Sequence, residues 1–185
     1  MATTMTKLLT ADDLLRLDSE GVRGELIRGV LHETMPAGYA HGKIVMNLGI
    51  LLGLYIKPRR LGSLIASDSG VWLERDPDTV REPDIAYFSA AKIPLDALDT
   101  GYAKVPPDLV VEITSPSTGR REAHDKALMW LSYGVDLVWV VQLDTRTVDV
   151  YQPDRAVVTL TEKDTLAGRD VLPGFTCAVS EVFST

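Results

Sequence analysis

The feature that most constrains this chain is a short apolar run, residues 109–113 within the segment 107–114, which is interrupted by one charge, Glu112. A run of this kind is typical of a strand that lies inside a sheet and is covered on both faces. Helical patterns precede and follow it, so strands are interspersed with helices along the chain. The sequence therefore predicts a mixed β-sheet flanked by helices, an α/β (α+β) fold.

Length and composition favour one domain over residues 1–185. The chain has 185 residues, of which 45% are hydrophobic and 24% are charged. A chain of this size can bury a core of its own without disulfides or metals. The single cysteine, Cys177, cannot form an internal disulfide, and we expect it to fill space in the core, as in proteins of a reducing cytosol.

The charge balance limits the classes of partner. The chain has 26 acidic and 19 basic residues and a net charge of -7, which excludes a protein that coats nucleic acid non-specifically. Its longest apolar stretch, residues 44–56, is broken by Asn47, Gly49 and Gly53. We therefore expect no membrane segment and a cytoplasmic protein.

Local patterns predict the elements in order. The first half is predicted to hold a helix capped by Thr10, a strand over 25–33, a helix over 39–57, and a hairpin of strands 63–74 and 80–88. The second half is predicted to hold the central strand 107–114, a capping turn at 115–118, a helix ending at Gly134, strands 135–143, 147–151 and 156–160, and a loop with a closing turn at 172–183.

Glu112 is the strongest candidate for a functional residue. Side chains alternate along a strand, so Asp108, Val110, Glu112 and Thr114 are expected on one face. An ionised carboxylate at a buried position needs a metal or a cation as partner. A strand end that reaches solvent and a structural salt bridge are the alternatives.

Two further residues favour a metal site over those alternatives. Asp84 follows Pro83 and opens the strand that ends at residue 88, although it can also cap a turn. Lys126 borders the sheet-facing side of the predicted helix, although a lysine there can extend into water. Two carboxylates on neighbouring strands and a lysine are suited to metal-assisted phosphodiester hydrolysis, with Mg²⁺ or alternatively Mn²⁺ as the ion.

Over nearly its whole length, the sequence resembles the Uma-type family of restriction-endonuclease-like bacterial proteins, within the PD-(D/E)XK nuclease superfamily. The matching segments are 25–29, His41, 68–71, 81–85, 107–117, Lys126, 133–135, Trp139 and 172–175. The resemblance implies a restriction-endonuclease-like fold and a Mg²⁺-dependent endonuclease that acts on DNA. It also implies Asp84 and Glu112 as metal ligands, and together with the size of the chain it suggests a homodimer.

The chain departs from the superfamily pattern at one position. The usual lysine lies two residues after the acid, where this chain has Thr114. The resemblance implies that Lys126 supplies the same charge from the following helix. Glu25 resembles an additional catalytic acid that many members place on an early element, and its alternative is an ion pair with Arg28 or Arg81.

Three more residues are candidates for substrate binding. His41 resembles a family position near the active site, and its alternative is a polar surface or capping residue. Arg120 and Arg121 begin the helix that carries Lys126 and can meet a phosphate backbone, or they can form an ordinary solvated charge cluster.

Two other functions remain open from the sequence. One is a noncatalytic binding or assembly module that retains the nuclease fold. The other is a hydrolase that uses Asp84 and Glu112 directly as an acid and base pair on a sugar or another small substrate.

Overall fold

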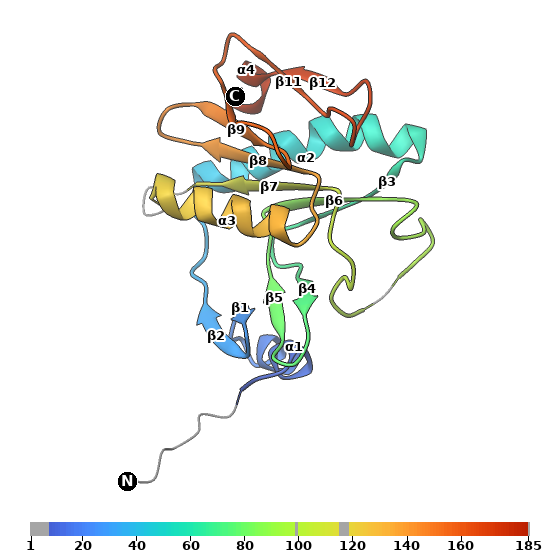
Figure 1. Ribbon diagram of the computed structural model, residues 1–185, viewed down its shortest axis with the longest axis vertical. Coiled ribbons are helices and arrows are strands. Elements are labelled where there is room, and N and C mark those ends of the chain that lie inside the picture. Colours follow the sequence, from blue (N-terminus) through green and yellow to red (C-terminus); the bar gives the residue numbers. More distant parts are fainter. Residues whose placement is uncertain (1–7, 99, 115–118, 185) are drawn as a thin grey trace. The chain divides into compact units, whose positions relative to one another are not determined.

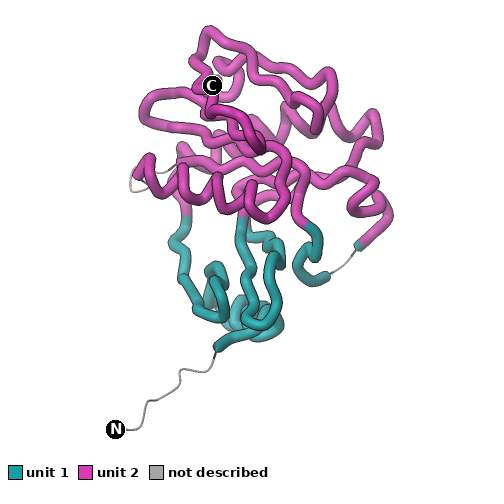
Figure 2. The backbone as a smooth tube through the Cα atoms, viewed as in Figure 1, with its two compact units in different colours: residues 1–36, 68–82, 98–105 teal, residues 37–67, 83–97, 106–185 magenta. Residues whose placement is uncertain are grey.

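The computed structural model describes residues 8–98, 100–114 and 119–184. These residues group into two compact units that alternate along the chain (Figure 2). Unit 1 contains residues 1–36, 68–82 and 98–105, and unit 2 contains residues 37–67, 83–97 and 106–185. The assignment of one domain to the whole chain stays a prediction.

Unit 1 consists of a short helix and a four-stranded sheet. Helix α1 (Ala11–Ser19) begins at the predicted cap, where the Thr10 hydroxyl accepts a hydrogen bond from the backbone N–H of Asp13. The sheet has the strand order β2-β1-β5-β4. Its strands are β1 (Gly24–Ile27), β2 (Val30–Glu33), β4 (Val71–Glu74) and β5 (Thr79–Arg81).

The single strand predicted over residues 25–33 is wrong, because this segment forms the hairpin β1–β2. Arg28 and Gly29 have φ angles of 50° and 79°. Two consecutive residues with positive φ make the tight turn that matches the twist of paired strands. Alternating hydrophobicity continues across this turn, so the pattern alone does not reveal it.

Unit 2 is built on a six-stranded mixed sheet with the order β10-β9-β8-β7-β6-β3. Its strands are β3 (Gly62–Ala66), β6 (Ile85–Ser89), β7 (Leu109–Ile113), β8 (Leu137–Gln142), β9 (Thr147–Tyr151) and β10 (Val158–Leu160). Strand β7 is buried at every position and lies between antiparallel β6 and parallel β8. The predicted central strand, and with it the mixed sheet, is confirmed.

Two helices cover opposite faces of this sheet (Figure 1). Helix α2 (Tyr39–Arg59) packs on β3 and β7, and helix α3 (Arg120–Ser132) packs on β7, β8 and β9. By length and composition alone α2 could cross a membrane, but its residues Ile44, Leu48, Leu52 and Ile56 are buried in the core of unit 2. The predicted capping turn of α3, residues 115–118, lies outside the described residues.

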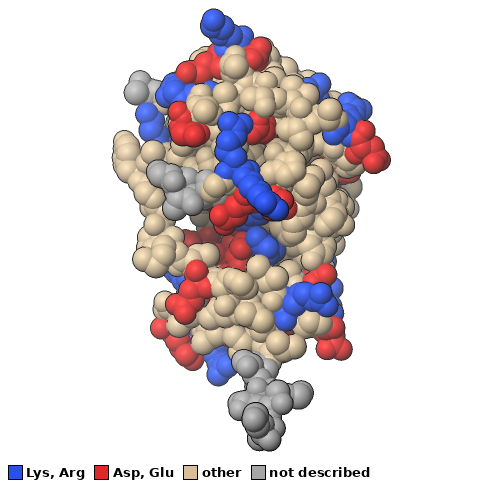
Figure 3. All heavy atoms as spheres, turned by 60° about the vertical axis from the view of Figure 1, so that its left-hand side comes forward, with Lys and Arg blue, Asp and Glu red and all other residues tan. Residues whose placement is uncertain are grey.

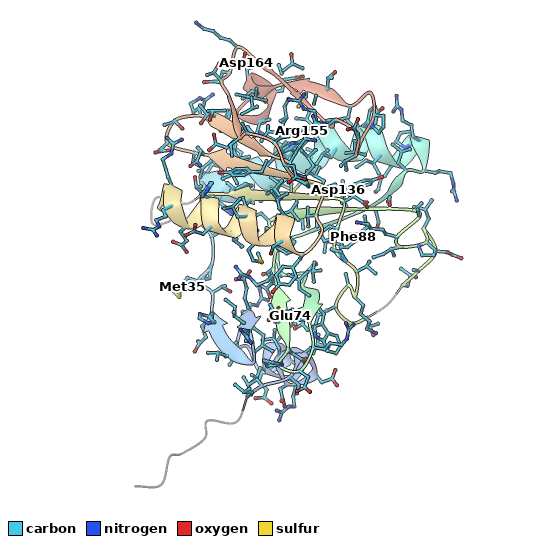
Figure 4. All side chains as sticks on the ribbon, in the orientation of Figure 1. Met35, Glu74, Phe88, Asp136, Arg155 and Asp164 are labelled. Carbon is cyan, nitrogen blue, oxygen red and sulfur yellow. The ribbon has the colours of Figure 1, made fainter. Side chains whose placement is uncertain are left out.

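The predicted hairpin of strands 63–74 and 80–88 is correct in its pairing but not in its continuity. Strand β3 pairs with β6 in unit 2, whereas β4 pairs with β5 in unit 1. Both predicted strands break, at residues 67–70 and 82–84, and the chain passes there between the units. Phe88, at 1% exposure on β6, belongs to the part that stays in the six-stranded sheet (Figure 4).

The C-terminal segment contains more structure than the predicted loop and turn. It forms a two-stranded sheet of β11 (Thr165–Ala167) and β12 (Thr176–Ala178), followed by the short helix α4 (Val179–Val182). Cys177 on β12 is buried in the core, as predicted, and burial raises the pKa of its thiol to about 11.

Candidate active site

Glu112 lies on the α3 side of strand β7 and is only 7% exposed. Two donors from α3 contact its carboxylate. The Trp130 indole Nε1–H donates to Oε1 at 2.6 Å, and the Lys126 ammonium lies 2.9 Å from Oε2. Lys126 and Trp130 are four residues apart and so occupy one face of the helix. The sequence alternative of a solvent-exposed strand end is therefore wrong for Glu112.

Burial raises the pKa of Glu112 to about 7. Desolvation is the largest cause, because removing a carboxylate from water disfavours its charged form. The charge of Lys126 lowers the pKa, and the nearby carboxylate of Asp84 raises it again. The site thus holds two acids whose mutual repulsion is offset by one lysine.

Asp84 directly precedes β6 and follows the register of that strand. Ile85 lies opposite Val111 in the antiparallel pair β6–β7, so the next position places Asp84 opposite Glu112. The backbone N–H of Ile113 donates to Asp84 Oδ2 at 2.6 Å. This hydrogen bond fixes the carboxylate of Asp84 at the end of β7, beside Glu112.

His41, in the first turn of α2, also joins this group. Its Nε2 lies 3.0 Å from Asp84 Oδ1, and its side chain is 12% exposed. The hydrogen bond to Asp84 raises the pKa of His41, and the charges of Asp84 and Glu112 act in the same direction, whereas burial and Lys126 lower it. Four of the predicted residues, Asp84, Glu112, Lys126 and His41, therefore meet at one place in unit 2.

The remaining predicted residues make other contacts. Glu25 belongs to unit 1, where its Oε2 lies 3.0 Å from Arg81 Nε and its Oε1 accepts a hydrogen bond from the backbone N–H of Glu82. The ion pair that the sequence offered as the alternative for Glu25 is thus present. Arg120 lies 3.9 Å from Asp149, and the side chain of Arg121 is 95% exposed.

Sequence reasoning missed two polar contributions to the α3 side of the sheet. The helical spacing of Trp130 with Ala123 and Ala127 marks it only as an apolar residue and gives no sign of a hydrogen-bond partner. Asp149 on β9 is 5% exposed and accepts hydrogen bonds from Gln142 at 3.0 Å and Thr159 at 2.5 Å. Its position between Val148 and Val150 is the same signal that drew attention to Glu112.

Comparisons with known proteins identify the family of the chain. A family model described as "Uma2: Putative restriction endonuclease" matches residues 11–180. The chain belongs to this family. The resemblance predicted from the sequence is therefore confirmed. No curated protein matches the chain.

A solved structure has a fold similar to that of this Uma2 chain. It is described as "a putative nuclease belonging to DUF820" from Anabaena variabilis. The two chains share 22% sequence identity and superpose with a TM-score of 0.78, over 95% of this chain and 97% of the other. At this identity the similarity concerns the fold, and it confirms the predicted mixed sheet flanked by helices.

The donor set of this Uma2 protein fits the divalent cation that the resemblance implies. Among residues 8–98, 100–114 and 119–184, no group of three or more His, Cys, Asp or Glu side chains is arranged to hold a metal ion. Mg²⁺ does not need such a group, because it is commonly bound by one or two carboxylates and keeps several waters. Asp84, directly before β6, and Glu112, on the adjacent strand β7, are the two carboxylates that would hold the ion.

Proposed function

We propose that this Uma2 protein is a Mg²⁺-dependent endonuclease that hydrolyses DNA phosphodiester bonds, with Mn²⁺ as an alternative ion. Asp84 and Glu112 are its metal ligands, and Lys126 is the catalytic cation. The observation that carries the proposal is the contact between Lys126 and Glu112 beside Asp84. It supports the inference that the lysine acts from α3 instead of from the strand position of Thr114.

The residues of the site have separate roles in the proposed hydrolysis. A divalent cation bound by the two carboxylates would polarise the attacking water and offset charge on the phosphate. Asp84 is oriented for this by the backbone N–H of Ile113. The ammonium of Lys126 offsets the negative charge that develops on the phosphate during hydrolysis.

Charge distribution favours unit 2 as the part that meets DNA. Of the 26 acidic and 19 basic residues, unit 1 contains 12 and 7, whereas unit 2 contains 14 and 12. The excess of negative charge is therefore mostly in unit 1. On the face shown in Figure 3, acidic and basic side chains are interspersed, a pattern that fits local phosphate contacts better than a non-specific coat.

Residues at the start of α3 are proposed to make those phosphate contacts. Arg121 is the most exposed arginine there, and Arg120 is 63% exposed beside Asp149. His41 is proposed to act at the site through its contact with Asp84, and the catalytic role of Glu25 stays a prediction of the sequence. A cytoplasmic homodimer completes the proposal, because an enzyme that cuts both strands commonly pairs two sites.

The test combines cleavage with metal binding on the full chain. Mg²⁺ and Mn²⁺ are titrated with plasmid and single-stranded DNA as substrates, and cleavage is expected to vanish with EDTA. Asp84→Asn is expected to lower cleavage by more than about 100-fold, since it removes a metal ligand. The matched control is Asp136→Asn, because Asp136 is exposed and directly precedes β8 as Asp84 precedes β6 (Figure 4).

Three results would contradict the proposal in different ways. Cleavage that survives EDTA, or equal cleavage by Asp84→Asn, excludes the metal mechanism. Hydrolysis of a sugar or another small substrate without metal favours the acid and base pair. A folded protein that binds neither cation by calorimetry and cuts no DNA is the noncatalytic binding or assembly module.

A further inference from the structure

Helix α3 holds both oxygens of Glu112, with a different kind of donor on each. Trp130 donates from Nε1 to Oε1 at 2.6 Å. Lys126, one turn earlier, lies 2.9 Å from Oε2. The proposed function uses the lysine and assigns no role to the tryptophan.

The two donors differ in how firmly they are placed. Trp130 is 0% exposed on the sheet-facing side of α3. Its indole offers a single N–H donor that does not titrate. The side chain of Lys126 is 25% exposed and ends in an ammonium with three donors on a flexible stem. The contact to Oε1 is therefore the fixed one, and the contact to Oε2 is the one that can be exchanged.

We propose that Trp130 is a positioning residue for the metal ligand Glu112. Its indole N–H holds Oε1 and thereby orients the carboxylate, so that Oε2, now paired with Lys126, is the oxygen available to a divalent cation. This inference rests on the proposed function. Loss of a group that hydrogen-bonds a metal ligand typically lowers metal affinity or activity by about 10 to 100-fold.

A second buried tryptophan, in the sheet that α3 covers, provides a matched control. Trp139 on β8 is also 0% exposed, but it lies in the apolar core on the α2 side, where it stacks on Phe175. Its Nε1 has no hydrogen-bond partner within the described part of the chain. Replacing either tryptophan by phenylalanine removes the same atoms from a buried site, and only one replacement removes a contact to Glu112.

The experiment is a calorimetric titration of Mn²⁺ into the wild type, Trp130→Phe and Trp139→Phe at one pH. We expect Trp130→Phe to weaken Mn²⁺ binding by about 10 to 100-fold and Trp139→Phe to leave it within about twofold, while both variants lose thermal stability. Equal affinities for Trp130→Phe and the wild type would overturn the inference and leave the proposed function standing. An equal loss in both variants would also overturn it, because the effect would then be one of core packing.

A measurement on the wild type covers the case in which Trp130→Phe does not fold. With ¹⁵N-labelled tryptophan, the indole N–H signal of Trp130 is expected to move on saturation with Mg²⁺, and that of Trp139 is expected to stay in place. A Trp130 signal that stays in place while Mg²⁺ binds overturns the role of Trp130. A wild type that binds neither cation overturns the inference together with the metal-dependent function.

Discussion

The two faces of the six-stranded sheet are built from the same strands but have opposite chemistry. On the α2 face, alternate residues of β7, β8 and β9 join one apolar cluster. On the α3 face, the other alternate residues include the buried polar groups Glu112, Gln142 and Asp149. One residue step along a strand separates the two environments, because successive side chains point to opposite faces.

This difference indicates where stability and chemistry reside. Burying apolar side chains under α2 stabilises the fold, whereas burying a carboxylate under α3 costs free energy unless a partner compensates. Trp130 and Lys126 provide that compensation for Glu112, and Gln142 and Thr159 provide it for Asp149. We therefore expect substitutions on the α2 face to act mainly on stability, and substitutions on the α3 face to act mainly on function.

The largest effect is expected from Trp139→Ala on the α2 face. It removes a fully buried indole that stacks on Phe175, so the free energy of unfolding should fall by about 3–5 kcal/mol. Denaturant unfolding measures this loss, and metal affinity of the molecules that remain folded should be unchanged. A loss below about 1 kcal/mol would show that this face is not the stabilising one.

Glu112→Gln is expected to separate stability from function on the α3 face. Because the folded-state pKa of Glu112 lies above its unfolded value, the folded protein binds the proton more tightly. The stability of the metal-free wild type should therefore fall as pH rises from about 4.5 to about 7. Glu112→Gln should remove this pH-dependent change in the free energy of unfolding, which is on the order of 1–3 kcal/mol. The same substitution should also abolish cleavage.

Denaturant unfolding in EDTA, from about pH 5 to about pH 8, measures the dependence on pH. The control is Glu122→Gln, which changes an exposed glutamate in the first turn of the same helix and should keep the wild-type slope. Added Mg²⁺ should stabilise the wild type near pH 8 and not Glu112→Gln. An identical slope in Glu112→Gln and the wild type would show that this carboxyl does not carry the dependence.

A smaller effect on stability is expected from His41→Gln, which removes the partner of Asp84, the other acid of the site. The hydrogen bond to Asp84 raises the pKa of His41, so its stabilising contribution is full below the unfolded value of about 6.5. That contribution is lost as pH rises through the folded pKa. The stability difference between wild type and His41→Gln should be about 1 kcal/mol near pH 6 and should shrink near pH 8.5.

Unfolding curves at the two pH values test this expectation, with His32→Gln as the control because His32 is exposed on β2. A difference that is constant across this range would mean that the ionisation of His41 is not linked to folding. A difference that grows toward high pH would reverse the sign of the pKa shift.

Much of this arrangement is present in local patterns of the sequence. Alternation along 107–114 predicted which residues share a face with Glu112, and helical spacing predicted that Lys126 borders the sheet. Tertiary contacts were not predictable in the same way. The indole of Trp130 counts as apolar in any periodic pattern, and its N–H gains a role only because β7 places Glu112 beside it.

The errors in the predicted strands have a similar origin. Gly29 and its neighbour reverse the chain inside an alternating segment, and residues 67–70 and 82–84 interrupt strands whose hydrophobic pattern continues. A period of two residues reports that side chains alternate, but not which sheet they enter. The division of residues between units 1 and 2 therefore requires the paired strands themselves.

The smallest effect on stability, and a selective one on DNA, is expected from Arg121→Ala. Its side chain is 95% exposed and lies 3.9 Å from Asp125, so its loss should leave unfolding nearly unchanged. If Arg121 contacts a phosphate, the variant should bind DNA a few-fold more weakly, and the slope of log affinity against log salt should decrease by about 1. Fluorescence anisotropy with labelled DNA at several salt concentrations measures both quantities.

Arg146→Ala provides the control for net charge. Arg146 is also on the surface, but two of its three guanidinium nitrogens, Nε and Nη2, donate hydrogen bonds to Glu162 at 2.7 Å. The two variants lose the same charge and therefore share any long-range effect on DNA. A salt slope that changes only in Arg121→Ala assigns a phosphate contact to the start of α3, next to the face that holds Glu112. An equal change in both variants would mean that Arg121 affects DNA binding only through the net charge of the protein. The start of α3 would then not belong to the proposed DNA-binding surface.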